Sequence, residues 1–177
     1  MTRARAQAWL AAFMTATAAL SGAASAGQKL AIFPIDMSFP RSEDDFFPGT
    51  RGPSPDEQRR LSMAQDELRK LLSANGRYEL VDLTPLAAEI TAAQPIYNCN
   101  GCEVPIAEKA KADLLMTSNI DKISETHLSL TVAIVDVAAS KLVRNASVLI
   151  QGNTDEAWLH GVRWLARNRL LAEGKPQ

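Results

Sequence analysis

The order of apolar and polar residues predicts several strands in this chain. The run from Lys29 to Asp36 is apolar on both faces, which is typical of a central strand covered by helices. Pro34 lies inside that run and has no backbone donor, so we expect an edge or a bulge there. Residues 126–136 alternate apolar and polar side chains, and residues 141–151 follow after the short link 138–140. These two segments are predicted to form an antiparallel hairpin.

Apolar residues at helical spacing predict a long helix after Ser54. Ser54 can cap the free amides, Pro55 suits the first turn, and Glu57 can complete a capping box. Asn75-Gly76 is a stop signal. The apolar stripe of this helix consists of Leu61, Ala64, Leu68, Leu71 and Leu72.

The remaining segments predict shorter elements and a last helix. We expect strands at 78–83 and 113–123, a weak helix at 84–91 and a short helix at 105–111. In the last helix, Asn153 and Glu156 are predicted to supply the cap and the box. Its inward residues are predicted to be Trp158, Gly161, Val162 and Leu165. Trp164 follows Trp158 by six positions, so one of the two should be in the core and the other partly exposed at a groove.

This order of elements predicts an α/β (α+β) fold. The expected architecture is a mixed β-sheet of about five strands with helices packed against it.

The first 26 residues have the order of a secretory signal peptide. Arg3 and Arg5 precede an apolar stretch, and the small residues Ala24-Ser25-Ala26 follow it. We therefore expect cleavage after Ala26, a periplasmic location and a single domain at 27–177. The first cysteine is Cys99, so no lipid anchor is expected at the cleavage site. Without residues 1–26 the chain is mildly acidic, which gives no reason to expect nucleic acid or an anionic membrane as a partner.

The two cysteines, Cys99 and Cys102, are the most informative local feature. In an oxidising compartment a structural disulfide is the default prediction, and a redox-active pair is the alternative. Glu103 stands where haem attachment needs a histidine, which excludes that use. Zinc would need further ligands, with His127 and His160 as the available histidines, and each is better explained as a surface or packing residue.

No catalytic motif is evident in the sequence. We find no nucleophile elbow, phosphate loop or dinucleotide fingerprint, and no cofactor is expected. The acidic run 43–45 is interpreted as a solvated loop. Phe46-Phe47 beside it either folds back onto the core or presents an apolar patch to a partner.

Four motifs carry a resemblance to a family of secreted bacterial proteins that contain a domain of unknown function. They are Asn98 to Cys102, Ala112 to Leu115, Val135 to Ala138 and Gln151 to Trp158. Two positions depart from the family pattern: Ser118-Asn119 replaces a glycine–tryptophan pair, and Ser140 stands where a turn glycine is common. More loosely, the succession of elements is similar to the TolB amino-terminal domain and to CsgG- and LpoB-like domains. That resemblance implies binding of other envelope proteins and no catalysis, although fold does not fix function.

The sequence thus favours a non-enzymatic periplasmic binding or accessory domain that contacts another cell-envelope protein. One alternative is a thiol–disulfide protein that uses Cys99 and Cys102. Another is a protein that binds a small molecule near the Cys99 loop and Trp158. The candidate interaction surface consists of Phe46, Phe47, Asn153, Asp155, Glu156 and Trp158.

Overall fold

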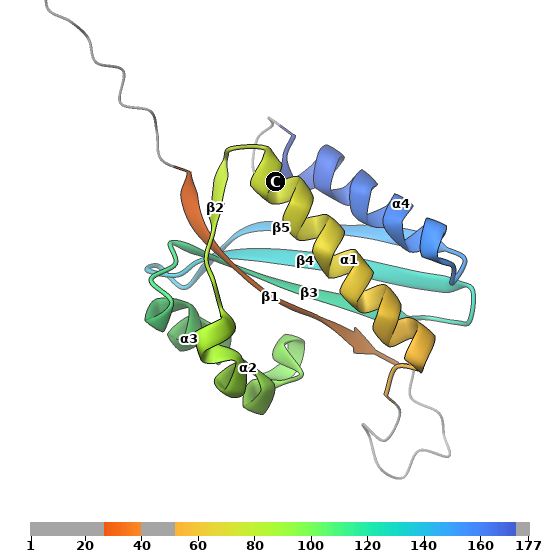
Figure 1. Cartoon of the computed structure of the whole chain (residues 1–177), viewed down its shortest axis with the longest axis horizontal. Coiled ribbons are helices and arrows are strands. Elements are labelled where there is room, and N and C mark those ends of the chain that lie inside the picture. The colour runs from red at the N-terminus through yellow and green to blue at the C-terminus, as the bar shows by residue number, and fades with distance from the viewer. Residues whose placement is uncertain (1–26, 40–51, 173–177) are drawn as a thin grey trace, which may run out of the picture.

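The computed structural model describes residues 27–39 and 52–172, and these form one five-stranded mixed sheet with helices on both faces. The strand order is β2-β1-β3-β4-β5 (Figure 1). The pairs β1–β2 and β1–β3 are parallel, whereas β3–β4 and β4–β5 are antiparallel. The strands are β1 (Gln28–Ser38), β2 (Tyr78–Leu80), β3 (Leu114–Lys122), β4 (His127–Asp136) and β5 (Lys141–Gln151). The predicted fold class and the hairpin are confirmed.

One face of the sheet is covered by α1 (Pro55–Ala74) and α4 (Asp155–Leu165), which lie side by side in Figure 1. The predicted inward residues of α4 are all buried, and Ala64, Leu68 and Leu72 of α1 join them in one core cluster. The capping box at Ser54 and Glu57 is present, as predicted. A five-residue π-helical segment (Ala166–Leu170) continues from α4.

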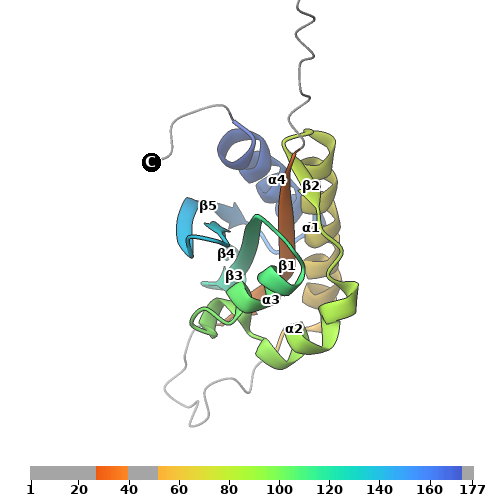
Figure 2. The ribbon, with the colours of Figure 1, turned by 90° about the vertical axis from the view of Figure 1, so that its left-hand side faces the viewer.

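The other face is covered over β1 and β3 by smaller elements that lie away from α4 (Figure 2). These are the 3-10 turn at Thr84–Leu86, α2 (Ala87–Ala93), the 3-10 turn at Ile96–Asn98 and α3 (Glu103–Lys109). Asp36 of β1 holds the second 3-10 turn, because its carboxylate accepts the Tyr97 N–H at 3.1 Å. Burial raises the pKa of Asp36, while the N–H groups of Tyr97 and Ile96 lower it. The buried apolar residues of these smaller elements form a second core cluster with residues of β1 and β3. No residue of β5 belongs to this cluster.

Several predicted details of the elements were wrong. The helix predicted at 84–91 is a 3-10 turn at Thr84–Leu86 followed by α2. The strand predicted at 78–83 ends at Leu80, because the Asp82 carboxylate accepts the Thr84 N–H at 2.9 Å and turns the chain. The helix predicted from 105 begins at Glu103. The N-cap of α4 is Thr154 rather than Asn153, since the Thr154 hydroxyl accepts the Ala157 N–H at 3.3 Å.

Pro34 coincides with a β-bulge, as its missing donor predicted. The register between β1 and β3 shifts between Ile32 and Ile35. In the part of the chain that the structure describes, no helix is both long and apolar enough to span a membrane.

Candidate functional site

The outer edge of β5 is the longest strand edge that the described sheet leaves open. β5 has 11 residues and pairs on one side with β4. Figure 2 shows it as the outermost element on its side of the sheet, with no described segment beyond it. An uncovered edge of this length is a template for a further strand.

The backbone groups on that edge can be assigned to particular residues. The Gly152 N–H donates to the Thr126 carbonyl at 2.7 Å, just beyond the last pair of the β4–β5 ladder. In an antiparallel ladder, residues that exchange bonds with the neighbour alternate with residues whose N–H and C=O point away. The outward groups therefore include those of Asn145, Ser147 and Leu149. Towards the start of β5, the ladder is interrupted at Val143.

Large apolar side chains gather at the same edge. Six such side chains are exposed among the described residues, and four of them lie on β5 or on the adjoining face of α4: Leu142, Val143, Leu149 and Trp164. Leu149 is 51% exposed and Trp164 is 38% exposed. Trp158 is fully buried, so the predicted division between the two tryptophans is confirmed.

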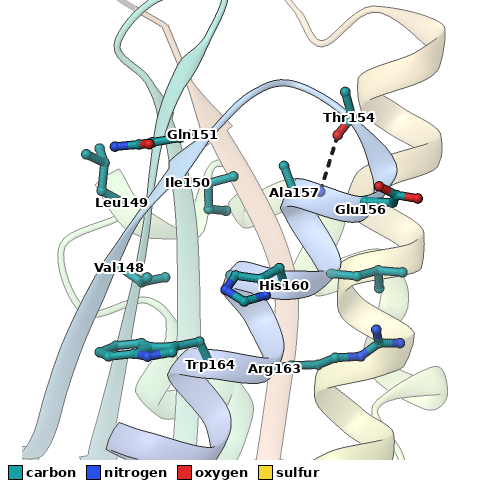
Figure 3. Close-up of a pocket in the computed structure, with 12 residues that line it drawn as sticks. Val148, Leu149, Ile150, Gln151, Thr154, Glu156, Ala157, His160, Arg163 and Trp164 are labelled. Carbon is teal, nitrogen blue, oxygen red and sulfur yellow. Dashed lines mark hydrogen bonds between the residues drawn. The ribbon is translucent and has the colours of Figure 1, made fainter.

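A groove of about 820 Å³ lies between β5 and α4 (Figure 3). Val148 and Ile150 point towards α4, Leu149 points away from it, and Trp164 lies close to Val148. Gly161 allows the close approach of helix and strand, because a Cβ atom there would lie 2.6 Å from Cγ1 of Ile150. The groove therefore adjoins the outward backbone of β5.

Positive charge flanks the amino-terminal half of this edge. Lys141 and Arg144 lie on β5, which carries no acidic residue. The Arg169 guanidinium lies 5.6 Å from the centre of the Trp164 ring, and Arg144 donates a hydrogen bond to the Arg169 carbonyl oxygen. Within the described ranges, none of these three cations has a carboxylate at ion-pair distance. We refer to the edge of β5, the groove and these cations together as the β5–α4 surface.

Asn153 and Trp158 of the predicted interaction surface are engaged in internal contacts. The Trp158 indole N–H donates to Oδ1 of Asn153 at 3.0 Å, and the Asn153 amide donates to Oε1 of Glu57 at 3.1 Å. Lys122 completes this polar clamp with an ion pair to Glu57 at 3.0 Å. Burial raises the pKa of Glu57, but hydrogen bonds from Ser54, Lys122 and Asn153 outweigh it and hold the pKa at about 2.

Asp155 is partly exposed and Glu156 is exposed. Asp155 accepts hydrogen bonds from Arg59 at 2.7 and 2.8 Å and from Arg60 at 2.9 Å. These contacts hold the pKa of Asp155 well below its ordinary value. Glu156 is exposed and lines the groove. The role of these two residues in partner binding stays a prediction, and Phe46 and Phe47 lie outside the described residues.

Cys99 and Cys102 form the predicted disulfide. Both cysteines pack against the cluster that contains α2 and α3, whereas Trp158 belongs to the cluster on the opposite face of the sheet. The Cys99 loop and Trp158 therefore do not line one small-molecule site. Cys99, Cys102 and Glu103 are the one group of potential metal ligands found in the described ranges, and the disulfide engages both sulfur atoms.

The histidines are apart from this group. His127 and His160 are both exposed, and His160 lines the groove beside α4.

Sequence reasoning missed the edge of β5 and the cations beside it. The signal was present in part, since Val143 and Leu149 break the alternation that a strand with one polar face would show.

Solved structures with a similar fold come from bacterial proteins. The LpoB C-terminal domain from Escherichia coli matches with a TM-score of 0.50 at 14% identity, covering 73% of this chain and 86% of that one. The corresponding Salmonella enterica domain gives 0.49 at 15% identity, covering 73% and 87%. TolB from Acinetobacter baumannii gives 0.41 at 11% identity, covering 80% and 28%. At these identities the similarity concerns the fold alone.

Comparison with sequences gives the family. No curated protein matches the chain. The model of a family described as a protein of unknown function (DUF2380) matches residues 28–170, and the chain therefore belongs to this family.

Proposed function

We propose that the protein is a non-enzymatic accessory domain of the cell envelope that binds another envelope protein through the β5–α4 surface. Export by residues 1–26 would place it in the periplasm, in line with the signal-peptide pattern of that segment. The similarity in fold to the LpoB C-terminal domain supports this proposal.

One observation carries the proposal: unpaired backbone and exposed apolar side chains coincide at a single edge. Leu149 and Trp164 flank the outward amides of β5 on its two sides. Strand addition and helix-lined grooves are both recurring modes of recognition between proteins.

Site-specific photo-crosslinking in the native envelope tests the proposal. A photoreactive residue at position 149 or 164 should yield a defined adduct with a second protein. The matched control is position 97, because Tyr97 is 48% exposed and lies in the 3-10 turn that Asp36 of β1 holds, away from β5. Adducts of equal yield at positions 97 and 149, or no adduct at either, would contradict the proposal.

Thiol–disulfide exchange remains the alternative for Cys99 and Cys102. The bond is formed, and Cys102 directly precedes the seven-residue helix α3. A reduction potential below about −300 mV would mark the bond as structural and remove this alternative.

A further inference from the structure

We infer that the β5–α4 surface binds its partner by strand addition, and that the added segment is extended and combines acidic with apolar residues. The inference rests on the proposed function and names the chemistry of the partner at the same surface.

The backbone of β5 supplies the first argument. Asn145, Ser147 and Leu149 present N–H and C=O groups in a row along the open edge. β5 contains no proline, so no donor is missing from that row. An extended peptide that pairs here would satisfy these groups, as in other complexes that extend a sheet.

The side chains on either side of the edge supply the second argument. Successive residues of an added strand point to opposite faces of the sheet. On the helix side they would meet Val148 and Trp164, which line the groove. On the other side they would lie beside Leu149, which points away from α4. Apolar residues of the added segment therefore find an apolar neighbour on both faces.

The cations beside the edge indicate which polar residues the added segment carries. Lys141, Arg144 and Arg169 flank the edge without an acidic neighbour at ion-pair distance in the described chain. A carboxylate in the added segment would pair with these cations, and an arginine that is already oriented loses less freedom on pairing. The β5 strand of a second copy of this chain would supply no carboxylate to these cations, because β5 carries no acidic residue. The charges therefore favour an acidic segment over self-association.

Amide hydrogen exchange with two synthetic peptides tests the inference. The probes are a short peptide in which valine alternates with glutamate and its counterpart in which lysine replaces glutamate. At about ten times its Kd, the acidic peptide should slow exchange of the Asn145, Ser147 and Leu149 amides about tenfold. The Ala146 and Val148 amides, which already bond to β4, should not change. The lysine peptide should have no such effect.

Variants separate the backbone and charge contributions. Ser147→Pro removes one outward donor, is tolerated on an edge strand and should abolish binding of the acidic peptide. Arg169→Glu should transfer the preference to the lysine peptide. Thr117→Ala, on β3, which β4 separates from β5, should leave binding unchanged.

Several outcomes would overturn the inference. Equal protection by both peptides would remove its charge component, and protection by neither would remove strand addition. Protection that rises with protein concentration without peptide would identify a second copy as the occupant. Failure of the peptides while position 149 still crosslinks would reject strand addition and leave the proposed function standing. Peptide binding without crosslinks in the envelope would reject the proposed function instead.

Discussion

The two edges of the sheet are treated in opposite ways. On one side, β2 pairs with β1 over three residues, and the rest of β1 extends beyond it. On the other side, β5 presents 11 residues without a described neighbour. Both edges expose backbone that needs partners, yet a side chain satisfies part of it at the first edge, and no described group satisfies it along Asn145 to Leu149 at the second.

At the edge of β1, a side chain replaces the missing strand. The Gln65 carboxamide of α1 accepts the Ile35 N–H at 3.1 Å and donates to the Phe33 carbonyl at 3.3 Å. Pro34 between them has no N–H to satisfy, and the β-bulge turns the strand locally. One glutamine and one proline thus close the edge of β1 between Phe33 and Ile35.

The contrast suggests that the free edge of β5 is a functional feature. Nothing comparable to Gln65 or Pro34 occurs along Asn145 to Leu149 in the described structure, although α4 lies close enough to provide such a side chain. Instead, α4 places Trp164 there. The difference between the edges is the basis of the predictions that follow.

The largest effect is expected from the helix that lines the open edge. Trp158→Ala should lower the free energy of unfolding by about 3–5 kcal/mol, because it leaves a cavity beneath α4. Trp164→Ala, on the same helix but partly exposed, should lower the free energy of unfolding far less. It should also reduce crosslinking at the β5–α4 surface. Urea denaturation of both variants measures this. Equal losses would mean that Trp164 is a core residue.

The polar clamp that joins α1 to α4 should make stability depend on pH. Because the pKa of Glu57 is about 2 in the folded protein and ordinarily 4.5, its contribution is complete above about pH 4.5 and is lost as the pH falls towards 2. The linked loss is about 3 kcal/mol. In Glu57→Gln, the free energy of unfolding, measured by denaturation at each pH, should fall less between about pH 4.5 and 2. Asp56→Asn, in the same turn of α1, should leave this fall unchanged; a smaller fall in both variants would contradict the assignment.

Removal of the Gln65 carboxamide should lower the free energy of unfolding by an intermediate amount. Gln65→Leu leaves the Ile35 N–H and the Phe33 carbonyl without their partner, so we expect a loss of about 1–3 kcal/mol. The Ile35 amide should also exchange faster. Gln58→Leu is the control, since the exposed Gln58 side chain bonds to the Pro53 carbonyl and not to a strand. An unchanged Ile35 amide in Gln65→Leu would show that the edge is not closed in this way.

The smallest effect on stability should come from the open edge. Leu149→Ser should change the free energy of unfolding by less than about 1 kcal/mol, since Leu149 is half-exposed. The same variant should lose envelope crosslinking from position 164. Ile150→Ser, one residue further into the buried face, should be strongly destabilising. A large loss of stability in Leu149→Ser would indicate a structural role for that side chain.

Local signals predicted the closed edge better than the open one. The missing donor of Pro34 and the capping box at Ser54 act within a few residues, so the sequence was sufficient to expect a bulge and a helix start. The role of Gln65 depends on α1 lying across β1, which no local pattern encodes. The same reason explains why the predicted cap at Asn153 was wrong. Its position suits a helix cap, but its side chain bonds to Trp158 and to Glu57, which lies far away in the chain.

The open edge depended on strand order. The hairpin of β4 and β5 was predictable from alternation, but either strand could have joined β3. Because β4 takes that place, β5 is the outermost strand. Only this strand order puts Leu149 and Arg169 beside an open edge.

Amide hydrogen exchange along β5 in the purified protein tests the central claim most directly. The account predicts an alternation: the Asn145, Ser147 and Leu149 amides exchange rapidly, whereas the Ala146, Val148 and Ile150 amides are protected by β4. The Ile35 amide at the opposite edge should be protected through Gln65. Uniform protection along β5 in the isolated protein would contradict the account, because it would mean that this edge is already paired.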